Sequence, residues 1–307
     1  MKMNINKSDA VSKNAFIAII GCPNVGKSSI LNYFCGQKIA IVTDKPQTTR
    51  TKITGVVTEN GTQIVFTDTP GMHRPKNKLG EKMIKVVGDS ITDVDACLLV
   101  VEPYGEVRDA EKELIAKLKK EKMPAILAIN KIDTVKDKSD LMTRILTFTS
   151  LYDFDAVVPV CAKNGSGMDA LFDEICRFSQ EGPHFFDDDT LTDRTEREIV
   201  AEMIREKLLR LLDKEIPHGI AVSVEKMRER EDGGIIDIEA IIYCEKESHK
   251  GIIIGKGGSM LKRASSNARA DIEKFLDSKV NLQCWVKVKE DWRNREGIIH
   301  NFGLDSD

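Results

Sequence analysis

The feature that most constrains this 307-residue chain is a glycine-rich loop between an apolar run and a helical pattern. Residues 15–29 read AFIAIIGCPNVGKSS, and a glycine, four residues and Gly-Lys-Ser form the spacing of a phosphate-binding loop. Backbone amides of such a loop and the N-terminus of the next helix attract anions, so we expect them to hold the α- and β-phosphates of a nucleotide. The loop predicts an α/β fold.

The pattern of strand followed by helix continues along the chain. Residues 52–71 hold two strand-like runs joined by Asn-Gly, which favours a tight hairpin. Apolar runs at 96–102, 124–131 and 156–163 are each followed by a helix-like stretch. We therefore predict a mostly parallel sheet with helices on both faces.

This alternation ends near residue 180, and a chain of this length can form two cores. Residues 181–193 contain glycine, proline and three consecutive aspartates without periodicity; we interpret the aspartates as a solvated turn rather than a metal site. The predicted organisation is a nucleotide-binding domain over 1–182, a linker over 183–192 and a second domain over 193–307. That domain has the order helix, strand, strand, helix, helix, strand, which predicts a small α+β fold.

Composition limits the cellular location, disulfide content and metal sites that we expect for this chain. The charged fraction is 31% and the hydrophobic fraction 41%, and the longest apolar runs are too short to cross a bilayer. The N-terminus lacks the apolar core of a secretory signal, so we expect a cytoplasmic protein. Seven cysteines form no close pair and are interpreted as small core or loop residues. The five histidines do not have zinc-ligand spacing, so we predict no transition metal.

The glycine-rich loop and the later segment DTPG together predict a phosphate and metal site. Lys27 would reach the β- and γ-phosphates, and Ser28 would ligate magnesium. The segment DTPG closes a strand, so that Asp68 can hold magnesium through water and the Gly71 amide can face a γ-phosphate.

Between these motifs lies an exposed polar segment, PQTTR, with two threonines. One of them can ligate magnesium only when a γ-phosphate is present. We favour Thr49 over Thr48.

The segment NKID follows another strand and indicates the base. The Asp133 carboxylate would accept from the ring N–H and exocyclic amine of guanine, whereas adenine lacks this pair of donors, and a site built around such bonds rejects a base without them. Asn130 would brace the loop, Lys131 would lie along the base, and the Ala162 amide would donate to the guanine oxygen. The predicted nucleotides are GTP and GDP.

The motifs GCPNVGKSS, PQTTR, DTPG, NKID and CAK resemble those of the Era-like family of translation-factor-related bacterial GTPases, and the likeness covers nearly the whole chain. The predicted nucleotide contacts are Gly21, Pro23, Asn24, Val25, Gly26, Lys27, Ser28, Ser29, Thr48, Thr49, Asp68, Gly71, Asn130, Lys131, Asp133, Cys161, Ala162 and Lys163. Of these, Ser28, Thr49 and Asp68 are the predicted metal ligands. Cys161 stands where the family usually has serine, with little effect expected, because the base contact comes from neighbouring backbone.

The resemblance implies a mechanism of hydrolysis without a side chain that orients water. Met72 occupies the place of the glutamine that positions the attacking water in Ras-type GTPases. The family likeness implies that Asn24 helps to hold a potassium ion near the phosphates, although Asn24 could instead shape the loop. Asn24, Lys27, Thr49 and Gly71 are the predicted catalytic group.

A second glycine cluster, GIIIGKGGSM at 251–260, lacks the four-residue spacer and follows a helix rather than a strand. It matches the Gly-x-x-Gly loop of an RNA-binding KH domain of the bacterial, type II order. Residues 248–295 carry 11 Lys/Arg against 5 Asp/Glu, so this end of the chain is basic. The predicted RNA contacts are Lys250, Ile252, Ile253, Ile254, Gly255, Lys256, Gly257, Gly258, Lys262, Arg263 and Arg269. We interpret Trp285 as a core residue and leave Trp292 open between the core and an RNA surface.

These features predict a monomeric GTP-dependent switch in which ordering of 38–50 and 71–90 changes how the domains sit. The resemblance implies that the RNA is small-subunit ribosomal RNA near its 3′ end, that the role is assembly of the small ribosomal subunit, and that peripheral association with the cell membrane occurs. The alternatives are a GTPase whose second domain docks protein, and a metabolic phosphotransferase, which the NKID and DTPG motifs disfavour.

Overall fold

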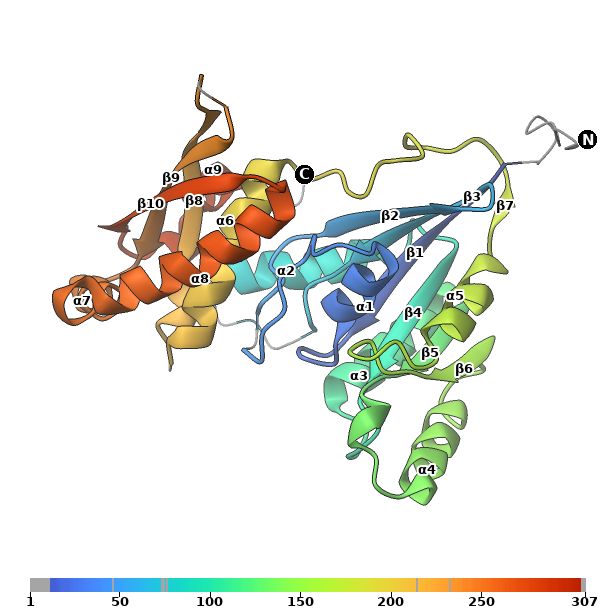
Figure 1. The fold of residues 1–307 in the computed structure, drawn as a ribbon. Helices are drawn as coiled ribbons and strands as arrows, with labels where there is room; N and C mark the ends of the chain where they lie inside the picture. The colour runs from blue at the N-terminus through green and yellow to red at the C-terminus, as the bar shows by residue number, and fades with distance from the viewer. Residues whose placement is uncertain are drawn as a thin grey trace, which may run out of the picture.

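The computed structural model describes residues 12–45, 47–72, 75, 77–213, 215–231 and 233–304, which form two units side by side (Figure 1). The strands of the first unit follow the order β2-β3-β1-β4-β5-β6. They are β1 (Lys13–Gly21), β2 (Ile53–Glu59), β3 (Thr62–Asp68), β4 (Ala96–Val101), β5 (Ala125–Ile129) and β6 (Ala156–Pro159). All run parallel except β2, which pairs antiparallel with β3, so the predicted sheet is confirmed.

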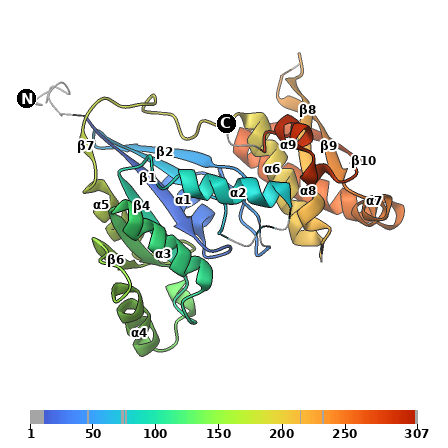
Figure 2. The same cartoon turned by 180° about the vertical axis from the view of Figure 1, so that it is seen from behind.

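Helices cover both faces of this sheet. One face carries α1 (Lys27–Phe34) and α5 (Met168–Cys176), and the other carries α2 (Lys78–Asp89), α3 (Asp109–Glu121) and α4 (Lys138–Thr149). Figure 1 shows α1 in front of the sheet, and Figure 2, turned by 180°, shows α2 and α3 in front. Successive strand residues face opposite cores: Leu98 packs in the α1 layer and Leu99 in the α3 layer. Strand β1 pairs with β3 on one side and with β4 on the other, so the strand order reverses at β1. In sheets of this kind a crevice forms at the carboxyl end of the strand where the order reverses.

The Asn-Gly hairpin is also confirmed. Asn60 and Gly61 have φ values of 51° and 78° and join β2 to β3. Both angles lie in the left-handed region that the tightest hairpin turns require, and asparagine and glycine adopt it most readily.

The second unit has the predicted order of helices and strands. Its elements are α6 (Glu196–Leu211), β8 (Ala221–Glu229), β9 (Ile235–Cys244), α7 (Glu247–Ile254), α8 (Ser259–Leu276) and β10 (Lys279–Val288), with short 3₁₀ turns η2 (Pro217–Gly219) and η3 (Lys256–Gly258). The central strand β9 pairs parallel with β10 and antiparallel with β8. After β10 the chain adds a 3₁₀ turn η4 (Trp292–Asn294) and a helix α9 (Glu296–Asn301). The α+β KH fold is therefore confirmed, with an additional C-terminal segment.

Residues 182–195 contain no helix or strand, and the chain here runs along the first unit. The short strand β7 (Gln180–Glu181) pairs with β1, and the Gln63 side-chain oxygen accepts from the amides of Phe185 and Phe186 at 2.8 and 3.0 Å. Farther along, the Val56 amide donates to Leu191 O on the edge strand β2 at 2.9 Å. The boundaries predicted at 182 and 192 stay predictions, but this connection is bound to the sheet by specific hydrogen bonds.

The two units meet at two places. Segment 38–50, after α1, contacts α6 and α8: Lys38 Nζ lies 2.5 Å from Glu206 Oε2 and 2.9 Å from Asp271 Oδ2. Helix α2 contacts the C-terminal segment, because Leu79 and Met83 share a buried cluster with Trp292. Among the described residues, no helix combines the length and apolar character needed to cross a membrane.

The two tryptophans are placed differently from the sequence interpretation. Trp285 is 45% exposed, so its assignment to the core is wrong. Side chains alternate along β10, and Val286 packs toward the helices, which leaves Trp285 on the open face of the sheet. Trp292 is fully buried, and its Nε1 donates to Gly219 O at 2.9 Å. Trp292 therefore belongs to the contact between the units.

We expect Trp292→Ala to lower the free energy of unfolding by about 3–5 kcal/mol, because the indole packing is lost and the Gly219 carbonyl loses its donor. Trp285→Ala is the matched control and should change this free energy by only about 0.5 kcal/mol. Urea denaturation followed by circular dichroism measures both values. Equal losses in the two variants would contradict the placement of Trp292.

Candidate nucleotide and RNA sites

The glycine-rich loop lies at the carboxyl end of β1 and opens into α1. Asn24 and Gly26 have φ values of 66° and 101°, so the backbone reverses tightly before the helix begins at Lys27. An added Cβ at Gly26 would lie 2.1 Å from Asn130 Nδ2. Glycine is therefore required both for the backbone angle and for the close approach of the base-binding loop.

Lys27 is buried beneath the loop. Its Nζ donates to Gly21 O at 3.1 Å and to Cys22 O at 3.0 Å. Burial lowers the pKa of Lys27, and the charge of Asp68 acts in the opposite direction. The ammonium group is thus held at the floor of the loop, where a phosphate would offer it a full opposite charge.

The three predicted metal ligands lie together. Ser28 Oγ donates to Asp68 Oδ2 at 2.6 Å, and Thr49 Oγ1 lies 3.0 Å from Ser28 Oγ and 3.4 Å from Asp68 Oδ2. The Thr48 hydroxyl instead donates to Lys45 O at 2.7 Å. The hydroxyl beside Ser28 and Asp68 is therefore that of Thr49, and its role as a metal ligand stays a prediction.

These residues fit magnesium. Asp68 Oδ1 is buried and makes no hydrogen bond, and burial raises the pKa of this carboxyl group against the opposing effect of Lys27. An unpaired buried oxygen of this kind is costly, and a hydrated cation would satisfy it. Magnesium commonly takes one or two protein carboxylates and leaves its other positions to water and phosphate, which matches two hydroxyls and one carboxylate.

The remaining phosphate-side residues border the same space, a cavity of about 310 Å³ lined by Lys27, Ser28, Thr49 and Gly71 among others. A Cβ added at Gly71 would lie 2.6 Å from the backbone of Pro23, so the two loops touch. Asn24 Nδ2 donates to Asp44 O at 2.6 Å, which ties the glycine-rich loop to segment 38–50.

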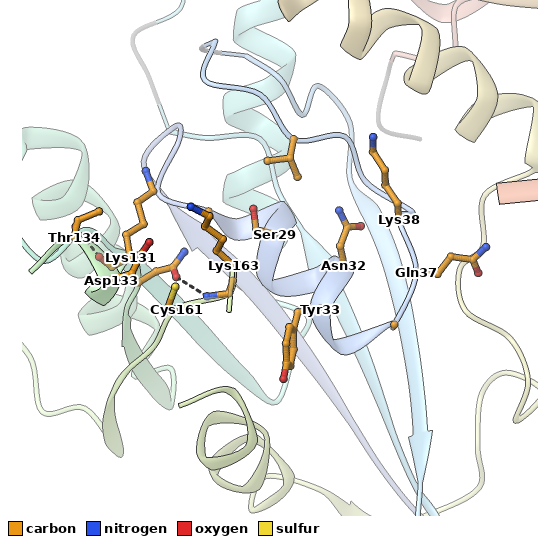
Figure 3. Close-up of a pocket in the computed structure, with 15 residues that line it drawn as sticks. Ser29, Asn32, Tyr33, Gln37, Lys38, Lys131, Asp133, Thr134, Cys161 and Lys163 are labelled. Carbon is orange, nitrogen blue, oxygen red and sulfur yellow. Dashed lines mark hydrogen bonds between the residues drawn. The ribbon is translucent and has the colours of Figure 1, made fainter. Parts of the chain in front are cut away.

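A larger cavity of about 560 Å³ adjoins this one and contains the predicted base-binding residues. Figure 3 shows Lys131, Asp133, Cys161 and Lys163 on one side and Asn32 and Tyr33 on the other. The volume lies in the range of small-molecule sites. Its lining joins the glycine-rich loop to the loops after β5 and β6, so one nucleotide can span both cavities.

Asn130 braces these loops, as predicted. Its Nδ2 donates to Val25 O at 2.9 Å, and its Oδ1 accepts from the Ala162 amide at 3.1 Å. Asp133 is exposed at the cavity wall and can accept hydrogen bonds from a base. The Cys161 side chain is almost fully buried, so any contribution from this position comes from its backbone.

Glu102 is a site residue that the sequence interpretation missed. Its carboxylate lies 2.7 Å from Lys131 Nζ and 2.5 Å from Arg108 Nη2. Burial raises the pKa of Glu102, but the contacts with Lys131 and Arg108 outweigh burial and lower it. Lys131 Nζ also donates to Asn24 O at 2.6 Å, so Glu102 and the glycine-rich loop together fix the position of the lysine. Its position directly after β4 could have identified Glu102 from the sequence, because the other site loops also follow strands of this sheet.

The second glycine cluster forms the turn between α7 and α8. Gly255, Gly257 and Gly258 have φ values of 73°, 58° and 78°, and an added Cβ at Gly257 or Gly258 would meet no atom within 4 Å. The loop therefore presents its backbone to open space. Of the cations predicted to contact RNA, Lys250 is partly exposed, and the others are exposed: Lys256, Lys262, Arg263 and Arg269.

One of the three isoleucines predicted to form an apolar wall is placed differently. Ile253 is fully buried in the core of the second unit, so its assignment as an RNA contact is wrong. Ile252 is 50% exposed and Ile254 partly exposed. Adjacent helical residues point about 100° apart, so three consecutive isoleucines cannot share one face.

Each of the two units matches a known family model. The family model "50S ribosome-binding GTPase" matches residues 16–131, and the model "KH domain" matches residues 215–293. GTPase Era of Clostridioides difficile is 48% identical over 95% of this chain and 99% of its own length. GTPase Era of Ruminiclostridium cellulolyticum is 48% identical over 95% of this chain and 97% of its own.

This chain belongs to the Era family of GTPases.

Solved Era structures share the whole architecture. A variant of Aquifex aeolicus Era bound to GDP·AlF₄⁻ superposes with a TM-score of 0.91 at 34% identity, covering 96% of this chain and all of that one. Era in complex with MgGDPNP and nucleotides 1506–1542 of 16S ribosomal RNA gives a TM-score of 0.92 at the same identity and coverage. Like the Era proteins it matches, this chain is a GTPase with a C-terminal KH domain.

We expect Lys27→Ala to abolish GTP binding, because the triphosphate loses its buried counter-charge. Lys119→Ala, on the exposed face of α3, is the control. Thermal unfolding with and without GTP measures the effect, since a ligand that binds the native state raises the melting temperature. A Lys27→Ala protein still stabilised by GTP as strongly as the control would refute this role.

Proposed function

We propose that this protein is a GTP-driven switch that binds small-subunit ribosomal RNA near its 3′ end and assists assembly of the small ribosomal subunit. The observation that carries the proposal is the open Gly255–Gly258 loop with exposed cations on the adjoining helix, in a KH domain joined to a guanine-nucleotide site. The 34% identical Era bound to a 16S ribosomal RNA fragment supports this choice of RNA.

In this proposal Ser28, Thr49 and Asp68 hold magnesium, and Asp133 selects guanine. The contacts among the three ligands and the unpaired Asp68 oxygen support the first assignment, and the exposed Asp133 carboxylate beside Lys131 supports the second. Magnesium would neutralise charge that develops on the phosphates during hydrolysis.

Potassium is the proposed second cation, near Asn24. The Asn24 side chain lies at the junction of the glycine-rich loop and segment 38–50, 2.6 Å from a backbone carbonyl of that segment. A cation held there would supply positive charge beside the phosphates, in a protein whose residue after Gly71 is Met72.

We expect GTP hydrolysis to be faster in potassium than in sodium at equal ionic strength, because the Asn24 site would favour the larger ion. Asn24→Ala should remove the difference between the two salts while GDP binding persists. Steady-state phosphate release measures both effects. Equal wild-type rates in potassium and sodium would refute the potassium site.

The protein is proposed to act as a monomer, because one chain carries both the nucleotide site and the RNA loop. Its proposed location is the cytoplasm. Peripheral attachment to the inner face of the cell membrane rests on the family resemblance alone.

The RNA assignment is tested with the full chain and an RNA of nucleotides 1506–1542 of 16S ribosomal RNA. We expect Lys256→Asp/Gly257→Asp to weaken binding on the order of a hundredfold, because two carboxylates would face the RNA backbone. Gly257 has φ 58° and open space around it, so aspartate can be accommodated there. A salt series should show a shallower dependence on salt concentration in the variant.

Lys120→Asp, a charge reversal on the distant helix α3, is the control and should bind RNA as the wild type does. If both proteins bind RNA equally well, the loop is not the RNA contact. If the wild type does not bind this RNA, the docking of a protein becomes the better function for the second unit.

A further inference from the structure

The second unit holds both neighbours of the proposed magnesium ligand Thr49. On one side, Thr48 O accepts a hydrogen bond from Arg205 Nη2 of α6. On the other side, Arg50 donates to Ile220 O at 2.6 Å and to His218 O at 2.9 Å. Thr49 therefore lies between a backbone carbonyl and an arginine side chain that are both bound to the KH domain.

Arg205 is oriented for this contact by its own helix. Arg205 is 1% exposed, and its Nε and Nη2 lie 2.7 and 2.6 Å from the two carboxylate oxygens of Glu202. A two-point contact with a carboxylate fixes the plane of a guanidinium group. Glu202 of α6 therefore fixes the orientation of the guanidinium group that donates to Thr48 O.

Arg50 is equally constrained. It is 4% exposed, it reaches two carbonyls around η2, and its guanidinium carbon lies 5.7 Å from the centre of the Trp292 ring. A lysine cannot reproduce this contact, because its ammonium lacks the planar fork that reaches both carbonyls. Arg50 thus follows any movement of η2 and Trp292.

Small displacements here have chemical consequences. Thr49 Oγ1 is within 3.4 Å of both Ser28 Oγ and Asp68 Oδ2, and a shift of the flanking peptide groups would remove it from that position. Misplacement of a reacting or metal-binding group by about 1 Å can reduce a rate on the order of a hundredfold.

We infer that Arg205 and Arg50 are positioning residues for GTP hydrolysis, through which the docked KH domain holds Thr49 at the metal site. The second unit is then an internal activator of the GTPase. This inference rests on the proposed role of Thr49 as a magnesium ligand.

The test uses full-length Arg205→Met and Arg50→Met, which remove the donors at similar side-chain length. We expect kcat to fall on the order of ten- to a hundredfold. The affinity for Mg²⁺–GDPNP should weaken while that for Mg²⁺–GDP stays at the wild-type value, because Thr49 would ligate magnesium only with a γ-phosphate present. A purely structural role would change both affinities together.

Two further variants complete the design. Lys226→Ala removes an exposed ion pair with Glu239 within the second unit, outside segments 38–50 and 71–90, and should leave kcat and both affinities unchanged. Arg205→Met combined with Thr49→Ala should be no slower than Thr49→Ala alone, since Arg205 acts through Thr49. Additive losses in the double variant would overturn the inference.

The inference also fails if the two methionine variants keep the wild-type kcat, or if they weaken GDP and GDPNP binding equally. Should a variant unfold, Arg205→Lys or Arg50→Lys, which keeps the charge and N–H donors but not the planar guanidinium fork, should give an intermediate kcat with normal GDP binding. A Thr49→Ala protein with wild-type hydrolysis would instead refute the proposed metal ligand, and is thereby distinguished from a failure of the arginines alone.

Discussion

Helix α6 is buried on two sides, and the coupling of the two units depends on it. One side packs Ile204 and Leu208 into the core of the KH domain, and the other presents charged groups to segment 38–50. Glu206, fully buried, lies 2.5 Å from Lys38 Nζ and 2.8 Å from Arg210 Nη2. A buried carboxylate is tolerated only with such partners, so moving α6 away from segment 38–50 would leave charge unpaired or require water to enter.

This contact connects two sites that are far apart in the sequence. Segment 38–50 carries Thr49 beside Ser28 and Asp68, whereas Lys38 also reaches Asp271 on α8, the helix that begins at the second glycine loop. Nucleotide-dependent ordering of the segment would change the partners available to both helices. Coupling of this kind needs two arrangements of the contact that the ligands favour differently, and it acts equally in both directions.

Much of this could be predicted from the sequence. Spacing and position relative to strands identified the glycine-rich loop and the hairpin, because both depend on local backbone geometry. The motif NKID identified Asn130, whose side chain contacts Val25 and Ala162 far along the chain. The KH order followed from periodicity, since every element carries its own apolar face. The errors had an available signal: alternation along β10 places Trp285 opposite Val286, and helical spacing separates Ile253 from its neighbours.

The contacts between the units could not be predicted in this way. Arg205, Glu206 and Lys207 resemble the solvated face of a helix, and their burial depends on where the two units dock. Arg50, within the exposed-looking PQTTR segment, is buried for the same reason. Charged residues that become buried in such contacts carry no apolar pattern, so only the three-dimensional arrangement reveals them.

In the proposed switch, nucleotide state and RNA binding are coupled through this interface. The most direct test measures the affinity of the full-length protein for nucleotides 1506–1542 of 16S ribosomal RNA when saturated with Mg²⁺–GDPNP and when saturated with Mg²⁺–GDP. Coupling through the interface predicts that the GDPNP form binds this RNA about fivefold or more tightly. Equal affinities, with both nucleotides shown to be bound, would contradict it.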